Sequence, residues 1–179
     1  MSRASSRHSS LQRYKVIIPN LMTTVRLLLF IPYYYLIQQG DFFLAGVTYF
    51  VALVTDLDGT VARSIKATTT FGAIYDPVVD AAFMLGGFAL LLQHSRIAAL
   101  PVYIFLAAAV YKFIPQLMYL LRNKRVKSTY VSKALGFAGF GSVLLATFGA
   151  PEIITTLILV LGAAGYFFLG TYWFSPSAR

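Results

Sequence analysis

Six long apolar stretches, separated by short polar connections, dominate this sequence. A helix of about 20 mostly apolar residues crosses the roughly 30 Å hydrocarbon core of a bilayer, so each stretch is long enough to be a transmembrane helix. The stretches run over Ile17–Gln38, Phe42–Val61, Ala73–Gln93, Ile97–Leu121, Ser132–Phe148 and Glu152–Tyr172. Hydrophobic residues make up 58% of the 179 residues and charged residues only 12%, whereas about a quarter of a soluble domain is charged. We therefore predict an all-α integral membrane protein, a six-transmembrane-helix bundle.

The predicted bundle fills residues 16–174, and a polar, basic arm precedes it over residues 1–15. Such an arm can be the start of a signal peptide. The apolar stretch that follows is too long for one, and Ile37–Gly40 offers no small-residue cleavage site. We therefore predict that the arm is a cytoplasmic tail. The chain has no cysteine, which excludes disulfides and thiolate metal sites.

Basic residues outnumber acidic residues by 15 to 6, which gives a formal net charge of +9. With the N-terminus inside, the predicted inner loops carry most of the basic side chains outside the arm: Arg63, Lys66, Arg122, Lys124, Arg125, Lys127 and Lys133. The predicted outer loops carry only Arg96. Because Lys and Arg accumulate on the cytoplasmic side of membrane proteins, both termini are predicted to be cytoplasmic. Nucleic-acid binding, another common reason for excess positive charge, is not expected of so apolar a chain.

The acidic residues are concentrated in one region. Four of the six fall within 25 positions, at the predicted cytoplasmic ends of the second and third helices: Asp56, Asp58, Asp76 and Asp80. A carboxylate at the centre of a membrane helix costs about 2.5–3.5 kcal/mol, so a compensating cation is expected. Carboxylate oxygens suit Mg²⁺, Mn²⁺ or Ca²⁺, whereas Zn²⁺ favours His or Cys. The two histidines, His8 and His94, lie far from this cluster in the sequence.

Helical spacing supports a shared metal site. Gly72, Asp76 and Asp80 follow one another at intervals of four residues, which places them along one face of a helix. An alternative is that Asp76, which precedes Pro77, caps the start of the helix, with the proline in its first turn. A cap does not explain Asp80 one turn further into an apolar stretch.

These residues resemble the signature of the CDP-alcohol phosphatidyltransferase family. That signature reads D-x-x-D-G-x-x-A-R, eight residues, then G-x-x-x-D-x-x-x-D. The chain matches seven of its eight fixed positions without a gap, at Asp58, Gly59, Ala62, Arg63, Gly72, Asp76 and Asp80. The segment Pro19-Asn20-Leu21, with Thr23 and Arg26, also resembles the opening of the bacterial phosphatidylglycerophosphate synthase and cardiolipin synthase branch.

The resemblance implies transfer of a phosphatidyl group from CDP-diacylglycerol to an alcohol acceptor, with release of CMP, by a protein that is surrounded by membrane lipid. It implies two divalent ions, Mg²⁺ or Mn²⁺, held by Asp58 and Asp76 with Asp56 and Asp80 completing the set, and Asp80 as general base. Residues next to the CDP moiety would be Thr55, Gly59, Ala62, Arg63 and Gly72. A homodimer in the bacterial inner membrane, with the active site facing the cytoplasm, is also implied.

The acceptor is predicted from the basic residues around the second inner loop. Arg122, Lys124, Arg125 and Lys133 are candidates to bind an anionic acceptor, and glycerol-3-phosphate fits best. Phosphatidylglycerol, which would make the protein a cardiolipin synthase, is the alternative. Equally, these residues fit a loop that only sets topology and contacts anionic lipid.

One position departs from the signature. Its first aspartate falls at Thr55, and the neighbouring carboxylate is Asp56. On an ideal helix Asp56 and Asp58 point about 200° apart. A tightened or bulged turn can bring Asp56 into the site, which we favour; Thr55 can act as a hydroxyl ligand; or the protein is a catalytically degenerate membrane scaffold.

The segment Asp56-Leu57-Asp58-Gly59-Thr60 also resembles the first motif of haloacid dehalogenase-like phosphatases. There, an apolar strand ends in D-x-D-G-T, and the first aspartate is the nucleophile. That fold is a soluble α/β domain, which long apolar stretches do not favour.

Two further predictions concern residues within the first and fourth apolar stretches. Tyr33, Tyr34 and Tyr35 are interpreted as anchors at the outer membrane surface. Lys112 and Pro115 are unusual in a membrane helix and are predicted to face the bundle interior or the inner interface.

Overall fold

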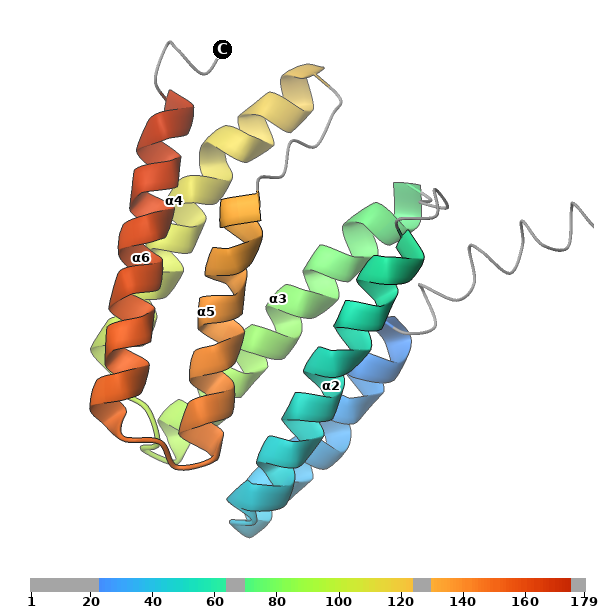
Figure 1. Ribbon diagram of the computed structural model, residues 1–179, viewed down its shortest axis with the longest axis vertical. Coiled ribbons are helices and arrows are strands. Elements are labelled where there is room, and N and C mark those ends of the chain that lie inside the picture. Colours follow the sequence, from blue (N-terminus) through green and yellow to red (C-terminus); the bar gives the residue numbers. More distant parts are fainter. Residues whose placement is uncertain (1–22, 64–69, 124–129, 175–179) are drawn as a thin grey trace, which may run out of the picture. The chain divides into compact units, whose positions relative to one another are not determined.

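The computed structural model of the chain describes residues 23–63, 70–123 and 130–174, and it consists of helices joined by short connections. A helix over residues 23–39 is followed by five more (Figure 1), which are α2 (Phe42–Arg63), α3 (Thr70–Gln93), α4 (Ala99–Asn123), α5 (Tyr130–Thr147) and α6 (Glu152–Phe174). These described ranges contain no strand. The helices lie where the apolar stretches predict them, so the all-helical class is confirmed.

The number of membrane spans is a separate question from the number of helices. In the described part of the chain, only α6, over Glu152–Tyr172, is long and apolar enough to cross a membrane. The other apolar segments are shorter: Phe42–Thr55, Val78–Gln93, Ala99–Pro115 and Ala134–Thr147. The apolar segment of α2 ends directly before Asp56, and that of α3 begins two residues after Asp76 and includes Asp80. The six-span arrangement therefore stays a prediction.

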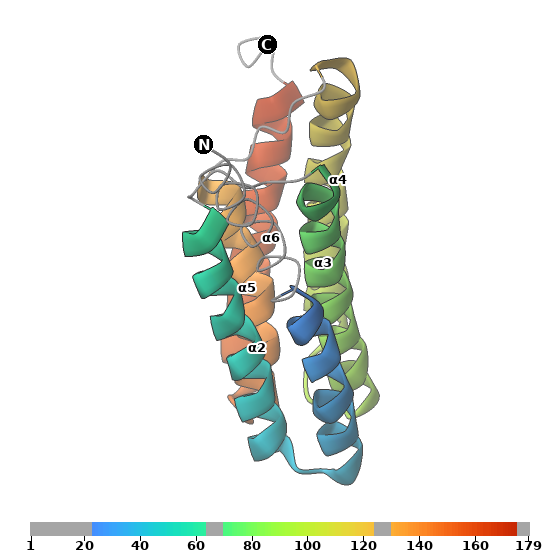
Figure 2. The ribbon, with the colours of Figure 1, turned by 90° about the vertical axis from the view of Figure 1, so that its right-hand side faces the viewer.

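The chain divides into two compact units, Met1–Gly86 and Gly87–Arg179, and each is described by itself. In the first unit a tight turn joins the helix over residues 23–39 to α2, and the two helices run antiparallel (Figure 2). Gly40 has a φ of +77°, which glycine adopts without strain. The backbone N–H groups of Gly40 and Asp41 donate to the carbonyls of Ile37 and Leu36, which closes the end of the first helix. The Asp41 carboxylate then accepts from the N–H of Leu44 and caps α2.

An aromatic layer forms the core of the first unit. The rings of Tyr33, Tyr49 and Phe83 come from the first helix, α2 and α3, and all three side chains are almost fully buried. The ring centroid of Tyr49 lies 5.1 Å from that of Tyr33 and 4.8 Å from that of Phe83. The predicted role of Tyr33 as a surface anchor is therefore wrong, because this ring points into the helix packing. Its neighbours Tyr34 and Tyr35 are exposed, as predicted.

In the second unit α4 and α5 both pack along α6 (Figures 1 and 2). Close approach depends on glycine: a Cβ at Gly165 would lie 2.5 Å from a methyl carbon of Leu135, and one at Gly170 would lie 2.6 Å from the ring of Tyr111. Lys112 is buried on α4, with its ammonium 5.9 Å from the ring centroid of Tyr166. The prediction that Lys112 faces the interior of the helix packing is confirmed within this unit.

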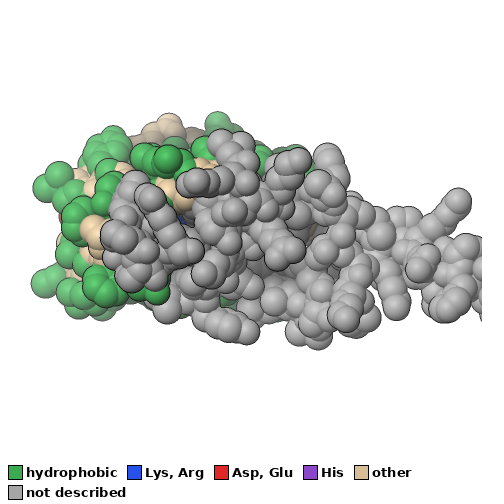
Figure 3. All heavy atoms as spheres, turned by 90° about the horizontal axis from the view of Figure 1, so that it is seen from above, with side chains coloured by type: hydrophobic (Ala, Val, Ile, Leu, Met, Phe, Trp, Pro, Cys, Tyr) green, Lys and Arg blue, Asp and Glu red, His purple; other side chains and the backbone are tan. Residues whose placement is uncertain are grey.

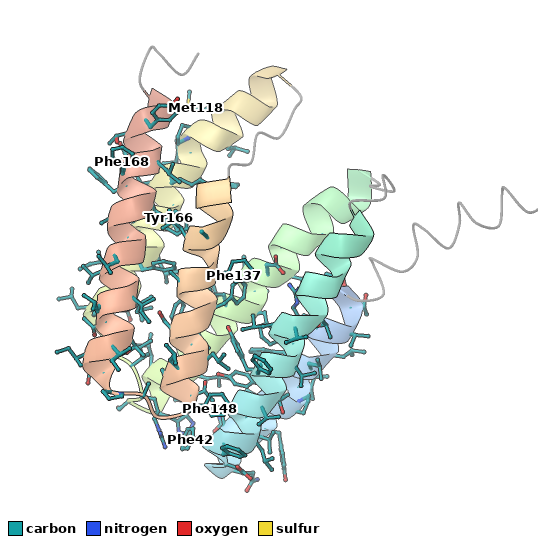
Figure 4. All side chains as sticks on the ribbon, in the orientation of Figure 1. Phe42, Met118, Phe137, Phe148, Tyr166 and Phe168 are labelled. Atoms are coloured by element: carbon teal, nitrogen blue, oxygen red, sulfur yellow. The ribbon has the colours of Figure 1, made fainter. Side chains whose placement is uncertain are left out.

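Large apolar side chains cover the outward faces of the helices. They are exposed in both units, for example at Ile31, Phe43, Leu100, Ile153 and Phe168. Figure 4 shows Phe168 extending outward from α6, and the described side chains visible in Figure 3 are mostly hydrophobic. Water-soluble proteins rarely expose apolar surface on this scale. The surface therefore fits a protein surrounded by lipid.

Candidate active site

The four aspartates of the predicted metal site lie in two helices of the first unit. Asp56 and Asp58 belong to the last third of α2, and Asp76 and Asp80 belong to the first half of α3. Many of the predicted site residues have a described position in a helix, but the structure does not describe their side chains. These are Asp56, Asp58, Asp76, Gly59, Ala62, Arg63, Gly72, Arg122 and Lys133. Lys124 and Arg125 lie outside the described residues altogether.

Helix boundaries decide the capping interpretation of Asp76. Because α3 begins at Thr70, Asp76 is its seventh residue and Pro77 its eighth. A capping residue precedes the first helical turn. The interpretation of Asp76 as a cap, with Pro77 in the first turn, is therefore wrong, and another reason is needed for an aspartate inside this helix.

The packing of α2 shows its buried face upstream of Asp56. Ala45, Tyr49 and Ala52 follow one another at intervals of four and three residues, and all three are completely buried. Thr55 and Asp56 come three and four residues after Ala52 in the same helix. Asp58 comes four residues after Val54, which is exposed.

The distorted turn predicted at Asp56 is absent. α2 is a continuous α-helix from Phe42 to Arg63, so the prediction of a tightened or bulged turn is wrong. On this undistorted helix Asp56 and Asp58 point about 200° apart, so the backbone does not turn both toward one ion.

Asp56 and Asp76 lie at the same level of the first unit. Tyr49 of α2 contacts Phe83 of α3, and the two helices run antiparallel, joined over residues 64–69. Asp56 follows Tyr49 by seven residues, and Asp76 precedes Phe83 by seven residues. Seven residues of α-helix rise about 10.5 Å. Both aspartates are therefore displaced by the same amount, and in the same direction, from the aromatic layer.

Asp80 is the one predicted metal ligand whose side chain the structure describes. Its Oδ1 accepts a hydrogen bond from Nη1 of Arg26, a residue of the first helix, and the two side chains form an ion pair. The Arg26 side chain is 5% exposed and that of Asp80 is 33% exposed. The sequence analysis did not place Arg26 in the site. The sequence feature that could have identified it is a single arginine inside an apolar stretch, because an arginine in a membrane helix requires a partner.

Thr55, the residue at the position of the first signature aspartate, is held by its own helix. Its hydroxyl donates to the carbonyl of Ala52 at 2.7 Å. This bond occupies the hydroxyl proton and fixes the side chain along the helix. The oxygen keeps lone pairs, so Thr55 stays a candidate weak ligand beside Asp56.

The phosphatase alternative is wrong. Its motif requires an apolar strand before the first aspartate, yet Val51–Thr55 and the D-x-D-G-T segment are all part of α2. Because the aspartates lie within a helix and not at the end of a strand, they do not have the backbone geometry of that phosphatase motif.

The donor set fits a hard divalent cation. All four predicted ligands are carboxylates, which suit Mg²⁺ or Mn²⁺. The described carboxylate, Asp80, is partly exposed, so it can meet a cation. No cluster of three acidic or histidine side chains occurs among the side chains that the structure describes, which include only one of the four aspartates.

Comparisons with known proteins point the same way. The profile of a family described as CDP-alcohol phosphatidyltransferase matches residues 16–170. Proteins named CDP-diacylglycerol–glycerol-3-phosphate 3-phosphatidyltransferase are similar to part of the chain. The one from Haemophilus influenzae is 37% identical over 83 residues, which cover 44% of this chain and 45% of that protein. The one from Pseudomonas fluorescens is 40% identical over 81 residues, which cover 43% of this chain and 42% of that protein. In Escherichia coli the identity is 37% over 81 residues, which cover 43% and 44%. The match thus spans less than half the length of these relatives.

Proposed function

Because the chain belongs to the CDP-alcohol phosphatidyltransferase family, we propose that it transfers a phosphatidyl group from CDP-diacylglycerol to glycerol-3-phosphate. The products are CMP and phosphatidylglycerophosphate. The named relatives support this acceptor, since each carries glycerol-3-phosphate in its name. The observation that carries the proposal is the placement of the aspartates, with Asp56 and Asp76 at one level and Asp80 one turn from Asp76.

Asp56, Asp58, Asp76 and Asp80 would hold the divalent ions, of which we propose two. Mg²⁺ or Mn²⁺ bound there would neutralise charge on the pyrophosphate oxygens and polarise the phosphorus under attack. We propose that Asp56 takes the place of the first signature aspartate, because it is the carboxylate next to that position.

The chain's own residues then divide the remaining work. Asp80 accepts the proton of the acceptor hydroxyl while the new oxygen–phosphorus bond forms and the bond to CMP breaks. A carboxylate is a weak base for an alcohol, so alignment of the hydroxyl must carry most of the effect. Gly59, Ala62 and Gly72 have no bulky side chain, which leaves room for the CDP moiety beside the backbone. Thr55 borders this space, and Arg63 supplies a fixed positive charge for its phosphates.

The acceptor phosphate is proposed to bind the basic residues around the second predicted inner loop, namely Arg122, Lys124, Arg125 and Lys133. With Lys127 these make five positive charges within 12 positions, which suit a doubly charged phosphate better than a neutral alcohol. This set connects the glycerol-3-phosphate in the names of the relatives to a feature of this chain.

We also propose that the six helices span the bacterial inner membrane with the active site and both termini in the cytoplasm, and that two copies form a homodimer. The exposed apolar side chains of both units and the apolar length of α6 support insertion into lipid. The concentration of Lys and Arg in the predicted inner loops supports the orientation. The homodimer rests on the family resemblance alone.

The test is CMP release from CDP-diacylglycerol by the purified full chain, with Mg²⁺ or Mn²⁺ and a panel of acceptor alcohols. We expect glycerol-3-phosphate to be used and Asp80→Asn to abolish release. Asp41→Asn is the matched control, because Asp41 caps α2 at the opposite end from Asp56 and asparagine caps equally well. Release with phosphatidylglycerol but not glycerol-3-phosphate would make the protein a cardiolipin synthase. No release with any acceptor would overturn the proposal in favour of a degenerate scaffold.

A further inference from the structure

We propose that Arg26 is a positioning residue that acts on the reaction through Asp80, holding this carboxylate in the orientation that cation binding and proton transfer require. The inference rests on the proposed function and adds to it a residue of the first helix that lies outside the aspartate signature.

The burial of the two partners indicates which of them meets the reactants. The Arg26 side chain is 5% exposed, whereas that of Asp80 is 33% exposed. A guanidinium this deep in helix packing is costly unless it is paired. Arg26 is therefore the more deeply buried partner, and Asp80 is the partner placed to meet the reactants.

The hydrogen bond leaves half of the carboxylate for other partners. Nη1 of Arg26 donates to Oδ1 of Asp80, and within the described residues Oδ2 accepts no hydrogen bond. A carboxylate fixed through one oxygen by a planar guanidinium loses rotational freedom. The second oxygen is then held in place for a cation or for the acceptor proton.

Contacts along the first helix and α3 fix where Arg26 lies. In the direction of increasing residue number, Thr24 meets Tyr75 at 3.4 Å, Arg26 meets Asp80, and the Phe30 ring meets that of Phe83 at 5.5 Å. Along this series of contacts the residue numbers of the first helix and of α3 increase together, so the two helices run parallel. The Arg26–Asp80 pair is thus one rung in a continuous packed contact.

The register of the two helices places Arg26 level with Asp80. Arg26 precedes Phe30 by four residues and Asp80 precedes Phe83 by three, and the rings of Phe30 and Phe83 lie 5.5 Å apart. Asp80 in turn follows Asp76 by one helical turn. A positive charge bound to Asp80 is therefore placed one turn from the next predicted ligand.

The first part of the test separates positioning from substrate binding. In the full chain in detergent or nanodiscs, Arg26→Gln should lower kcat for CMP release about 100-fold, the usual cost of a misplaced catalytic group. The KM for CDP-diacylglycerol should change less than threefold. Arg26→Lys keeps the charge but not the planar fork, so it should recover part of the loss. Arg96→Gln, which removes an arginine from the α3–α4 connection, is the matched control and should behave as wild type.

The second part needs no turnover and stays informative if the proposed function fails. Mn²⁺ binding is measured by electron paramagnetic resonance in wild type, Arg26→Gln, Asp80→Asn and the double variant, with thermal unfolding to confirm folding. Arg26→Gln should weaken Mn²⁺ binding about tenfold when Asp80 is present and should have no effect in the Asp80→Asn background.

Three results would overturn the inference. One is a raised KM with unchanged kcat, which would make Arg26 a substrate ligand. Another is tighter Mn²⁺ binding in Arg26→Gln, or an equal effect with and without Asp80, which would make its action a through-space charge effect. The third is a lower unfolding temperature with normal kcat and Mn²⁺ affinity, which would make the pair structural only.

Discussion

Substituting Gly86 with alanine should disturb the site without touching any aspartate. Gly86 lies on α3, where it faces Phe30 of the first helix. An added Cβ would lie 2.3 Å from Cζ of Phe30 and 2.8 Å from Cε2. Carbon atoms in good contact are about 3.5–4.0 Å apart, so the ring or the helix must give way by about 1.2 Å.

The ring has little room to absorb this movement. Phe30 packs against Tyr33 at 5.9 Å and against Phe83 at 5.5 Å. Overpacking of this kind costs about 1–3 kcal/mol, and alanine returns up to about 1 kcal/mol through its higher helix propensity. The expected net loss is about 1–2 kcal/mol, which for a chain of this size lowers the unfolding temperature by about 2–8 °C.

Activity should suffer more than stability. Arg26 lies one turn before Phe30, so part of a shift of the first helix reaches the Arg26–Asp80 pair. Because a misplacement of about 1 Å can cost about 100-fold in rate, kcat should fall at least about tenfold. The assays are thermal unfolding in detergent and CMP release from CDP-diacylglycerol.

Two further variants make this prediction specific. Gly141→Ala is the control, because a Cβ there meets nothing within 4 Å, so stability and kcat should be unchanged or slightly higher. Phe30→Leu added to Gly86→Ala should recover part of both losses by removing the ring from the contact. A Gly86→Ala protein with wild-type kcat and unfolding temperature would refute the reasoning, as would a double variant worse than the single.

Three other predictions follow from the same structure. In a CMP-release assay, Asp56→Ala should lower kcat at least about 100-fold, whereas Thr55→Ala should lower it less than tenfold. The reverse order would assign the first ligand position to Thr55. Removal of divalent ions with EDTA should abolish CMP release and Mg²⁺ or Mn²⁺ should restore it, whereas activity that survives EDTA would contradict the carboxylate donor set. Asp41→Ala should lower the free energy of unfolding by about 1 kcal/mol and Asp41→Asn should not, in thermal or denaturant unfolding, because asparagine retains the cap of α2.

The positions of the helices could be predicted because apolar length is a local property of the sequence. The turn at Gly40 and Asp41 follows from the preferences of these residues for a helix end and a helix start. Tyr33 could not be told from Tyr34 and Tyr35 in this way, since three adjacent aromatic residues carry no periodicity. Only packing against Tyr49 and Phe83 distinguishes the buried ring.

The aspartates could be recognised from their spacing, but not the residue that supports them. Arg26 and Asp80 are 54 positions apart, and no local pattern joins them. The distorted turn at Asp56 could not be decided from the sequence, because local spacing does not show whether a helix is regular. The structure has a regular α2 through Asp56 and Asp58, so the assignment of Asp56 to the first ligand position stays a prediction.

The central claim is that Asp56 of α2 and Asp76 of α3 face one shared pocket, and cross-linking between cysteines tests it most directly. The chain has no native cysteine, so paired substitutions report without background. Asp56→Cys with Asp76→Cys in the full chain should form an intramolecular disulfide on mild oxidation, detected by mass spectrometry after proteolysis. Leu57→Cys with Asp76→Cys should not, since residue 57 lies about 100° further around the helix. Efficient cross-linking of the 57–76 pair, with none for the 56–76 pair, would contradict the account.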